Sequence, residues 1–106
     1  MAIELRSYQD DHGRKPFDRW LSDLRDIGAR SRILQRLSRL EAGVLGDAKT
    51  VGGGVLELRI DHGPGYRVYF GRHGDALVLL LIGGDKRTQA ADIAKAKDYW
   101  NDWKDC

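Results

Sequence analysis

The sequence predicts an α+β domain with the element order β-α-α-β-β-β-α. Three consecutive strand-like segments lie between residues 55 and 82, separated by glycine-containing turns. Two apolar stripes at helical spacing precede this region, and a third follows it. A three-strand meander packed against helices is typical of an α+β fold.

The strands are predicted from alternation of apolar and polar residues. Segment 3–8 alternates as a half-buried strand does, and segments 55–61 and 66–72 each place apolar residues on one face. Segment 76–82 is apolar on both faces, which indicates a central strand. The glycine-rich segment 47–54 is predicted to be a mobile loop.

The helices are predicted from apolar stripes and their end signals. The first runs over about 16–25 from Pro16, which a first helical turn tolerates, and the second over about 29–42. The last begins near Thr88, a suitable N-cap. We therefore expect one domain over 1–106. It should contain a four-stranded, mostly antiparallel twisted sheet, helices on one face of it, and a hairpin formed by the first two helices.

Composition indicates a cytoplasmic protein that needs no cofactor. The chain has 106 residues, a length of one domain. Its start lacks the pattern of a signal peptide, and its longest apolar run is too short to span a bilayer. The single cysteine, Cys106, excludes an intrachain disulfide and a zinc cluster, and the three histidines are scattered over turns. Arginines outnumber lysines by 12 to 6, and arginine matches the geometry of phosphate.

The first candidate site lies on the hairpin of the strands at 55–61 and 66–72. Alternation places Arg59 and Arg67 on its non-core face, so both should be exposed to solvent. Two registers are open, pairing Arg59 either with Arg67 or with Tyr69. Two like charges set close together cost stability unless an anion joins them. Either Glu57 or Asp61 is that anion, or the pair forms a phosphate site.

The second candidate site is segment 83–89, between the central strand and the last helix. Lys86 and Arg87 lie at a helix N-terminus, which attracts anions, and the glycines at 83 and 84 allow a ligand to approach. The second helix carries a basic stripe off its apolar face. This stripe is either a solvated surface or a track for an RNA backbone, formed by Arg30, Arg32, Arg36 and Arg39.

Three strings in this order resemble the RelE/ParE toxin superfamily, and most closely its HigB-like "addiction module killer protein" branch. They are LELRI at 56–60, GYRVYF at 65–70 and GDKRTQ at 84–89. The resemblance covers nearly the whole chain. It implies a RelE-like fold and an endoribonuclease that cuts mRNA in the ribosomal A site without a metal ion.

The resemblance also implies roles for particular residues. Arg67 matches the arginine at the scissile phosphate, Lys86 and Arg87 match a basic pair after the last strand, and Arg59 matches a basic strand position. With Tyr69 and the helix arginines as RNA contacts, this is the predicted site. The sequence departs from the pattern where strand lysines, a catalytic tyrosine and a C-terminal histidine are expected, at Val55, Glu57, Ile93, Tyr99 and Asp102. The general acid and base stay open among Lys86, Asp92 and His62.

The partners implied by the resemblance are the ribosome with its mRNA and a cognate antitoxin, expected to be a small helix-turn-helix protein. No membrane is implied, and DNA is contacted only through the antitoxin complex. Two alternatives remain. One is a ParE-like toxin that binds DNA gyrase and cleaves no RNA, and the other is an inert partner in a repressor complex whose basic face contacts operator DNA.

Overall fold

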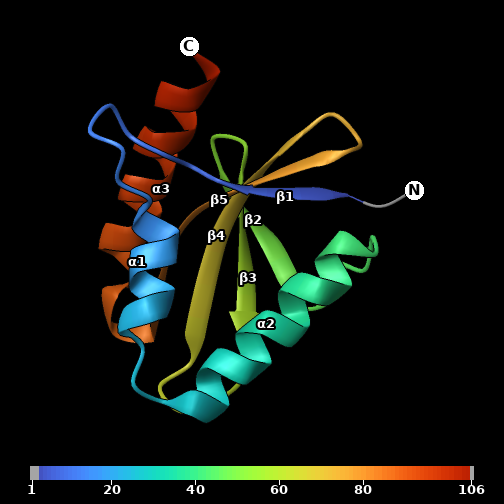
Figure 1. Cartoon of the computed structure of the whole chain (residues 1–106), viewed down its shortest axis with the longest axis vertical. Coiled ribbons are helices and arrows are strands. Elements are labelled where there is room, and N and C mark those ends of the chain that lie inside the picture. Colours follow the sequence, from blue (N-terminus) through green and yellow to red (C-terminus); the bar gives the residue numbers. More distant parts are fainter. Residues whose placement is uncertain (1–2, 106) are drawn as a thin grey trace.

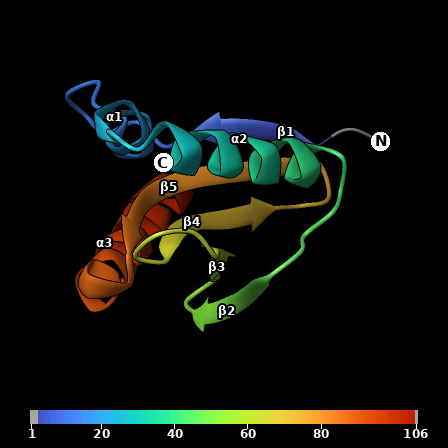
Figure 2. The same cartoon turned by 90° about the horizontal axis from the view of Figure 1, so that it is seen from below.

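The computed structural model describes residues 3–105 and contains one five-stranded mixed sheet with helices on both faces (Figures 1 and 2). The strand order is β1-β5-β4-β3-β2, with β1 parallel to β5 and the other neighbours antiparallel. The strands are β1 (Glu4–Ser7), β2 (Ala48–Gly52), β3 (Val55–Ile60), β4 (Tyr66–His73) and β5 (Leu77–Asp85). The helices are α1 (Pro16–Asp23), α2 (Ile27–Glu41), the short 3₁₀ helix η1 (Lys86–Thr88) and α3 (Gln89–Lys104).

The α+β class is confirmed, but the predicted strand count is wrong because residues 48–52, within the predicted loop, form the strand β2. The short strand β2 pairs with β3, and the turn between them contains Gly52, Gly53 and Gly54, all three of which have positive φ. A glycine run of this kind closes a hairpin as well as it forms a flexible loop. The segment Ala48-Lys49-Thr50-Val51 before it contains the only signal of the strand, its β-branched residues.

The predicted arrangement of helices on one face is also wrong. Figure 2 shows α1 and α2 on one face of the sheet and α3 on the other. One apolar cluster joins α1 and α2 to the sheet, through residues such as Phe17, Ile33 and Phe70. A second cluster joins α3 to the opposite face, with Trp100 and Tyr69 at its centre. The central strands β4 and β5 are therefore buried on both faces.

The two N-terminal helices do not form the predicted hairpin. They are consecutive, but α1 packs along β5 whereas α2 lies across β3 (Figure 1). The helix α2 begins at the N-cap Asp26, whose carboxylate accepts a hydrogen bond from the backbone N–H of Ala29. Cys106, on which the disulfide argument rested, lies outside the described residues. Within residues 3–105, no helix is both long enough and apolar enough to cross a membrane.

Candidate functional site

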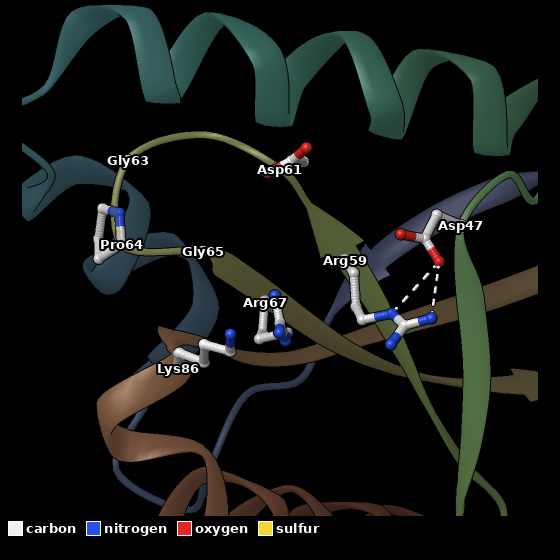
Figure 3. A pocket seen from close by; sticks show the side chains of 8 residues that line it. All are labelled: Asp47, Arg59, Asp61, Gly63, Pro64, Gly65, Arg67 and Lys86. Carbon is white, nitrogen blue, oxygen red and sulfur yellow. Dashed lines mark hydrogen bonds and ion pairs between the residues drawn. The ribbon is translucent and has the colours of Figure 1, made fainter.

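The three residues predicted to be catalytic line one cavity of about 410 Å³ at the β3–β4 turn (Figure 3). Arg59 comes from β3, Arg67 from β4, and Lys86 from η1. We call this the hairpin cavity, and its wall consists of Asp47, Arg59, Asp61, Gly63, Pro64, Gly65, Arg67 and Lys86. The predicted cations thus meet in space, although about 27 residues of sequence separate the first from the last.

The register of β3 and β4 brings the two arginines together. Arg59 pairs directly with Arg67, which is the first of the two predicted registers, and Tyr69 pairs with Glu57. Gly65 has a φ of 82° and brings the turn close to the cations. A Cβ at this position would lie 3.5 Å from Arg67 Nη1 and 3.8 Å from Lys86 Cδ. The tight turn therefore forms one wall of the cavity against both side chains.

Arg59 is held by an ion pair that a ligand can replace. Its Nη2 and Nε atoms donate to Asp47 Oδ1 at 2.9 and 3.2 Å. The side chains of Arg59 and Asp47 are 38 % and 56 % exposed. An exposed pair of this kind contributes little to stability, about 0–1 kcal/mol. Arg59 is thus available to an anion at small energetic cost, and Asp47 is a site residue that the sequence analysis missed.

Arg67 is not solvent-facing, contrary to the prediction. Its side chain is only 11 % exposed. Its Nη1 atom donates to the carbonyl of Tyr66 at 3.2 Å, while its Nε atom has no hydrogen-bond partner among the described residues. In Figure 3 the guanidinium and the Lys86 ammonium extend into the same space, and Arg59 turns toward Asp47. The buried stem of Arg67 fixes where its charged end meets the cavity.

Glu57 lies directly behind Arg67 and supplies its counter-charge. Its side chain is fully buried, and its Oε1 atom is 3.8 Å from Arg67 Nε. Its other oxygen, Oε2, accepts hydrogen bonds from Tyr69 Oη at 2.9 Å and from Gln89 Nε2 at 2.7 Å. Oε1 itself has no hydrogen-bond partner among the described residues. The carboxylate is therefore anchored on one side and directs its free oxygen at the arginine, so one of the two predicted anionic partners, Glu57, is present.

This network removes Tyr69 from the set of RNA contacts. Tyr69 is fully buried, so no base can stack on it. Burial raises the pKa of its phenol, and the hydrogen bond to Glu57 raises it further. Tyr69 thus acts as a neutral donor that holds Glu57 in place. Gln89, the first residue of α3, does the same from the helix side and was not identified from the sequence.

Glu57→Gln is expected to lower the free energy of unfolding by about 1–3 kcal/mol, the cost of leaving buried polar groups without suitable partners. The amide would keep the volume of the side chain but remove the charge behind Arg67. Denaturant unfolding measures the change. Glu41→Gln, at an exposed carboxylate, is the matched control and should leave stability within about 0.5 kcal/mol. Equal stability of the wild type and Glu57→Gln would show that the carboxylate does not hold Arg67.

Lys86 and Arg87, predicted as a basic pair, have separate surroundings. Lys86 lines the hairpin cavity, whereas Arg87 does not. The Arg87 guanidinium binds Asp85 Oδ2 at 2.9 Å and is 80 % exposed, and this contact lowers the pKa of the Asp85 carboxyl. Asp85 also accepts a hydrogen bond from the backbone N–H of Arg87. The start of η1 is therefore capped by the protein's own carboxylate, and of the predicted basic pair only Lys86 lines the hairpin cavity.

The glycines at 83 and 84 do not admit a ligand. Both lie inside β5, which continues to Asp85. A Cβ on Gly83 would lie 2.1 Å from Trp20, and one on Gly84 would collide with the Asp92 carboxylate. The space left by the missing side chains is thus filled by the protein itself, by α1 on one face and α3 on the other.

Comparison with known proteins decides the family. Residues 19–100, which include α2, the hairpin cavity and most of α3, match the model of the phage-derived Gp49-like proteins, DUF891. The chain belongs to this Gp49-like family. An uncharacterized protein of Haemophilus influenzae is 52% identical to it over 81 residues, covering 76% of this chain and 82% of the relative.

Membership of the Gp49-like family corrects the assignment made from the sequence strings. The match is to a family distinct from the RelE/ParE superfamily and its HigB-like branch. The strings that suggested the resemblance are short: they cover most of β3, the start of β4 with the preceding Gly65, and the end of β5 with η1. Arg59, Arg67 and Lys86 all lie within the matched residues, so the hairpin cavity is part of the Gp49-like domain.

The arginines of α2 in this Gp49-like protein divide into two groups. Arg36 is half-buried and donates to the carbonyls of Arg59 at 2.6 Å and Asp47 at 3.2 Å, so its charge ties the helix to β3 and to the segment before β2. Arg32 and Arg39 are exposed and line a shallow cavity of about 240 Å³. Asp61 lines both this cavity and the hairpin cavity, so the two adjoin.

Of the three candidates for general acid and base, the Gp49-like structure places only Lys86 in the hairpin cavity. Asp92 is buried at 8 % exposure beside Thr88, and burial raises the pKa of its carboxyl. The His62 ring bonds Asp26 at 3.1 Å and links the β3–β4 turn to the start of α2. Both residues therefore support elements around the cavity and do not line it.

Proposed function

We propose that this protein is the toxin of a toxin–antitoxin pair and that it cleaves mRNA on the ribosome without a metal ion. The supporting observation is the convergence of Arg59, Arg67 and Lys86 on one cavity from three separate elements. Cleavage of RNA by its own 2′-hydroxyl builds negative charge on the phosphoryl oxygens. Cations fixed in advance around that phosphate stabilise the transition state more than the ground state.

The reaction assigned to the cavity is an internal transfer. The ribose 2′-oxygen attacks the adjacent phosphorus while the bond from phosphorus to the 5′-oxygen breaks, which leaves a 2′,3′-cyclic phosphate and a free 5′-hydroxyl. Water takes the proton from the 2′-hydroxyl. Arg67 binds the non-bridging oxygens, and Lys86 donates a proton to the leaving 5′-oxygen and regains one from solvent. Arg59 exchanges Asp47 for the backbone phosphate next to the cleaved bond.

The expected partners follow from the same charges. A ribosome presents mRNA and ribosomal RNA, and the exposed Arg32 and Arg39 extend the basic surface from the hairpin cavity. A co-encoded antitoxin should silence the toxin by covering these cations with an acidic segment. We expect that antitoxin to be a small helix-turn-helix protein and any contact with DNA to pass through it. Association driven by such charges slows as salt rises.

Induction of the wild type in a bacterium is expected to stop growth and to produce new mRNA 5′-ends. In a purified translation system the cuts should appear only when ribosomes are added, and with no metal ion beyond the magnesium that the ribosomes themselves need. Co-expression of the neighbouring antitoxin gene should restore growth. Normal growth of cells that express large amounts of this protein in folded form would contradict the toxin assignment. Growth arrest with intact mRNA and failing DNA supercoiling would show a gyrase-binding toxin instead.

A further inference from the structure

A second and larger cavity, of about 520 Å³, lies between α1 and α3. We call it the interhelix cavity. Its wall consists of Asp10, Arg14, Lys15, Pro16, Arg19, Trp20, Asp23, Lys95 and Tyr99. Figure 2 shows α1 on one face of β5 and α3 on the other, and Figure 1 shows both helices at the left of the strands. The volume is within the range of small-molecule binding sites.

The charge of this cavity favours an anionic ligand. Four cations line it against two carboxylates. The carboxylate of Asp10 is already engaged by Arg14 and by two backbone N–H groups, which lowers the pKa of its carboxyl. Within residues 3–105, Lys15, Arg19 and Lys95 form no ion pair. Three cations at this cavity are therefore available to a ligand.

Two aromatic side chains line the same cavity from opposite helices. Trp20 of α1 is half-buried and is held by Phe17 and Tyr66, with ring centroids 5.9 and 6.2 Å away. Tyr99 of α3 is half-buried and stacks on Tyr8 at 4.8 Å, which fixes its ring. Fixed aromatic rings beside cations are what binding of single-stranded nucleic acid requires, because bases stack on the rings and phosphates bind the cations. An acidic peptide would bind through the cations alone, so the two aromatic rings favour a nucleic acid over a peptide.

The interhelix cavity is close to the hairpin cavity. The ring of Tyr66 lies beside Trp20, and the carbonyl of Tyr66 accepts the hydrogen bond from Arg67. One residue, Tyr66, therefore contacts a wall residue of each cavity. This connection through Tyr66 favours one strand of RNA occupying both cavities.

We propose that the interhelix cavity binds a nucleotide of single-stranded RNA that flanks the cleaved bond. Its base lies against Trp20 and Tyr99, and its phosphate binds Arg19 and Lys95. This assignment rests on the proposed function, since it names a second subsite for the same RNA. It gives the protein a means of selecting the nucleotide beside the cut by the fit of its base.

Binding of an uncleavable RNA tests the subsite. The probe is a fluorescent single-stranded hexaribonucleotide with 2′-O-methyl groups, titrated at several salt concentrations. Tyr99→Leu is expected to weaken binding about tenfold, as loss of one base stack does. Arg19→Ala and Lys95→Ala should each lower the salt slope by about 0.7, the value for one phosphate contact on a single strand. Arg72→Ala, an exposed arginine at the far end of β4, is the charge-matched control and should change neither.

The mononucleotide CMP separates failure of the subsite from failure of the proposed function. CMP should shift the NMR signal of the Trp20 indole in the wild type and equally in Lys86→Ala, because Lys86 lines only the other cavity. The protein could bind RNA through Tyr99, Arg19 and Lys95 and yet cleave no RNA. That result would support the subsite and contradict the proposed nuclease function. Unchanged RNA affinity in all three variants would overturn the subsite even if cleavage is found. Binding of polyglutamate at this cavity in place of RNA would also overturn it.

Discussion

Arg67→Ala is expected to lower the rate of mRNA cleavage by ~10²–10³-fold, the typical effect of removing one preorganised donor to a developing oxyanion. The guanidinium is the most firmly placed of the three cavity cations, because its stem is buried and Glu57 lies behind it. Single-turnover cleavage of mRNA on ribosomes measures the rate. Growth arrest on induction should be lost with it.

Three variants define what the loss means. Lys86→Ala should reduce cleavage comparably without disturbing the fold, since Lys86 is exposed. Arg67→Lys keeps the charge but loses the fork of donors that fits phosphate, so it should recover only part of the rate. Arg72→Ala, an exposed arginine outside both cavities, should cleave as the wild type does. Circular dichroism and denaturant unfolding confirm that each variant is folded. Full activity in both Arg67→Ala and Lys86→Ala would contradict the site assignment.

The alternation of residues predicted most of the elements and limited the central hairpin to two registers. The core face of both strands fixes the parity of the connection, which allows Arg59 to pair with either Arg67 or Tyr69, and the structure has the pair with Arg67. The second helical layer was missed, although the sequence contained its signal. A segment that is apolar on both faces, such as 76–82, needs a layer on each side. The apolar stripe of the last helix, with Ala96 and Trp100, is the layer that covers the second face.

In the candidate site, too, the sequence pattern predicted which residues carry the charge but not how tertiary packing buries and anchors them. Spacing and charge identified the three cations, because they lie on one face of adjacent strands or just after a strand. The burial of Arg67 depends on α3 covering that face, and no local pattern encodes it. The sequence left Glu57 open as an anionic partner of the arginines from its place on β3, but its anchoring by Gln89 depends on a contact across 32 residues. The Asp47 pair likewise required the unpredicted strand β2.

Each helical layer is fitted to the sheet by a tryptophan over a glycine. Trp20 of α1 packs on Gly83 of β5, and Trp100 of α3 packs on Gly71 of β4, on opposite faces. Neither glycine has a positive φ, so the backbone does not require glycine at these positions. A Cβ would lie 2.1 Å from the first ring and 2.3 Å from the second. Both contacts are too short for any side chain, so these glycines are explained by packing alone.

Gly83→Ala and Gly71→Ala are therefore each expected to lower the free energy of unfolding by about 3–5 kcal/mol. The indole cannot stay in place, and the cost approaches that of deleting a large buried aromatic side chain. Urea unfolding measures the change in each variant.

A double-mutant cycle shows whether the tryptophan is the cause. Trp100→Leu should be destabilising alone but should make Gly71→Ala far less harmful, with an interaction energy of about 1–3 kcal/mol. The same should hold for Trp20→Leu with Gly83→Ala, whereas the crossed pair Trp20→Leu with Gly71→Ala should be additive because the two contacts lie on opposite faces. Stability close to that of the wild type in either single glycine variant would mean that the helices can shift on the sheet without cost. If the tolerant variant is Gly71→Ala, the placement of α3, and with it the anchoring of Glu57 by Gln89 behind Arg67, would not be rigid.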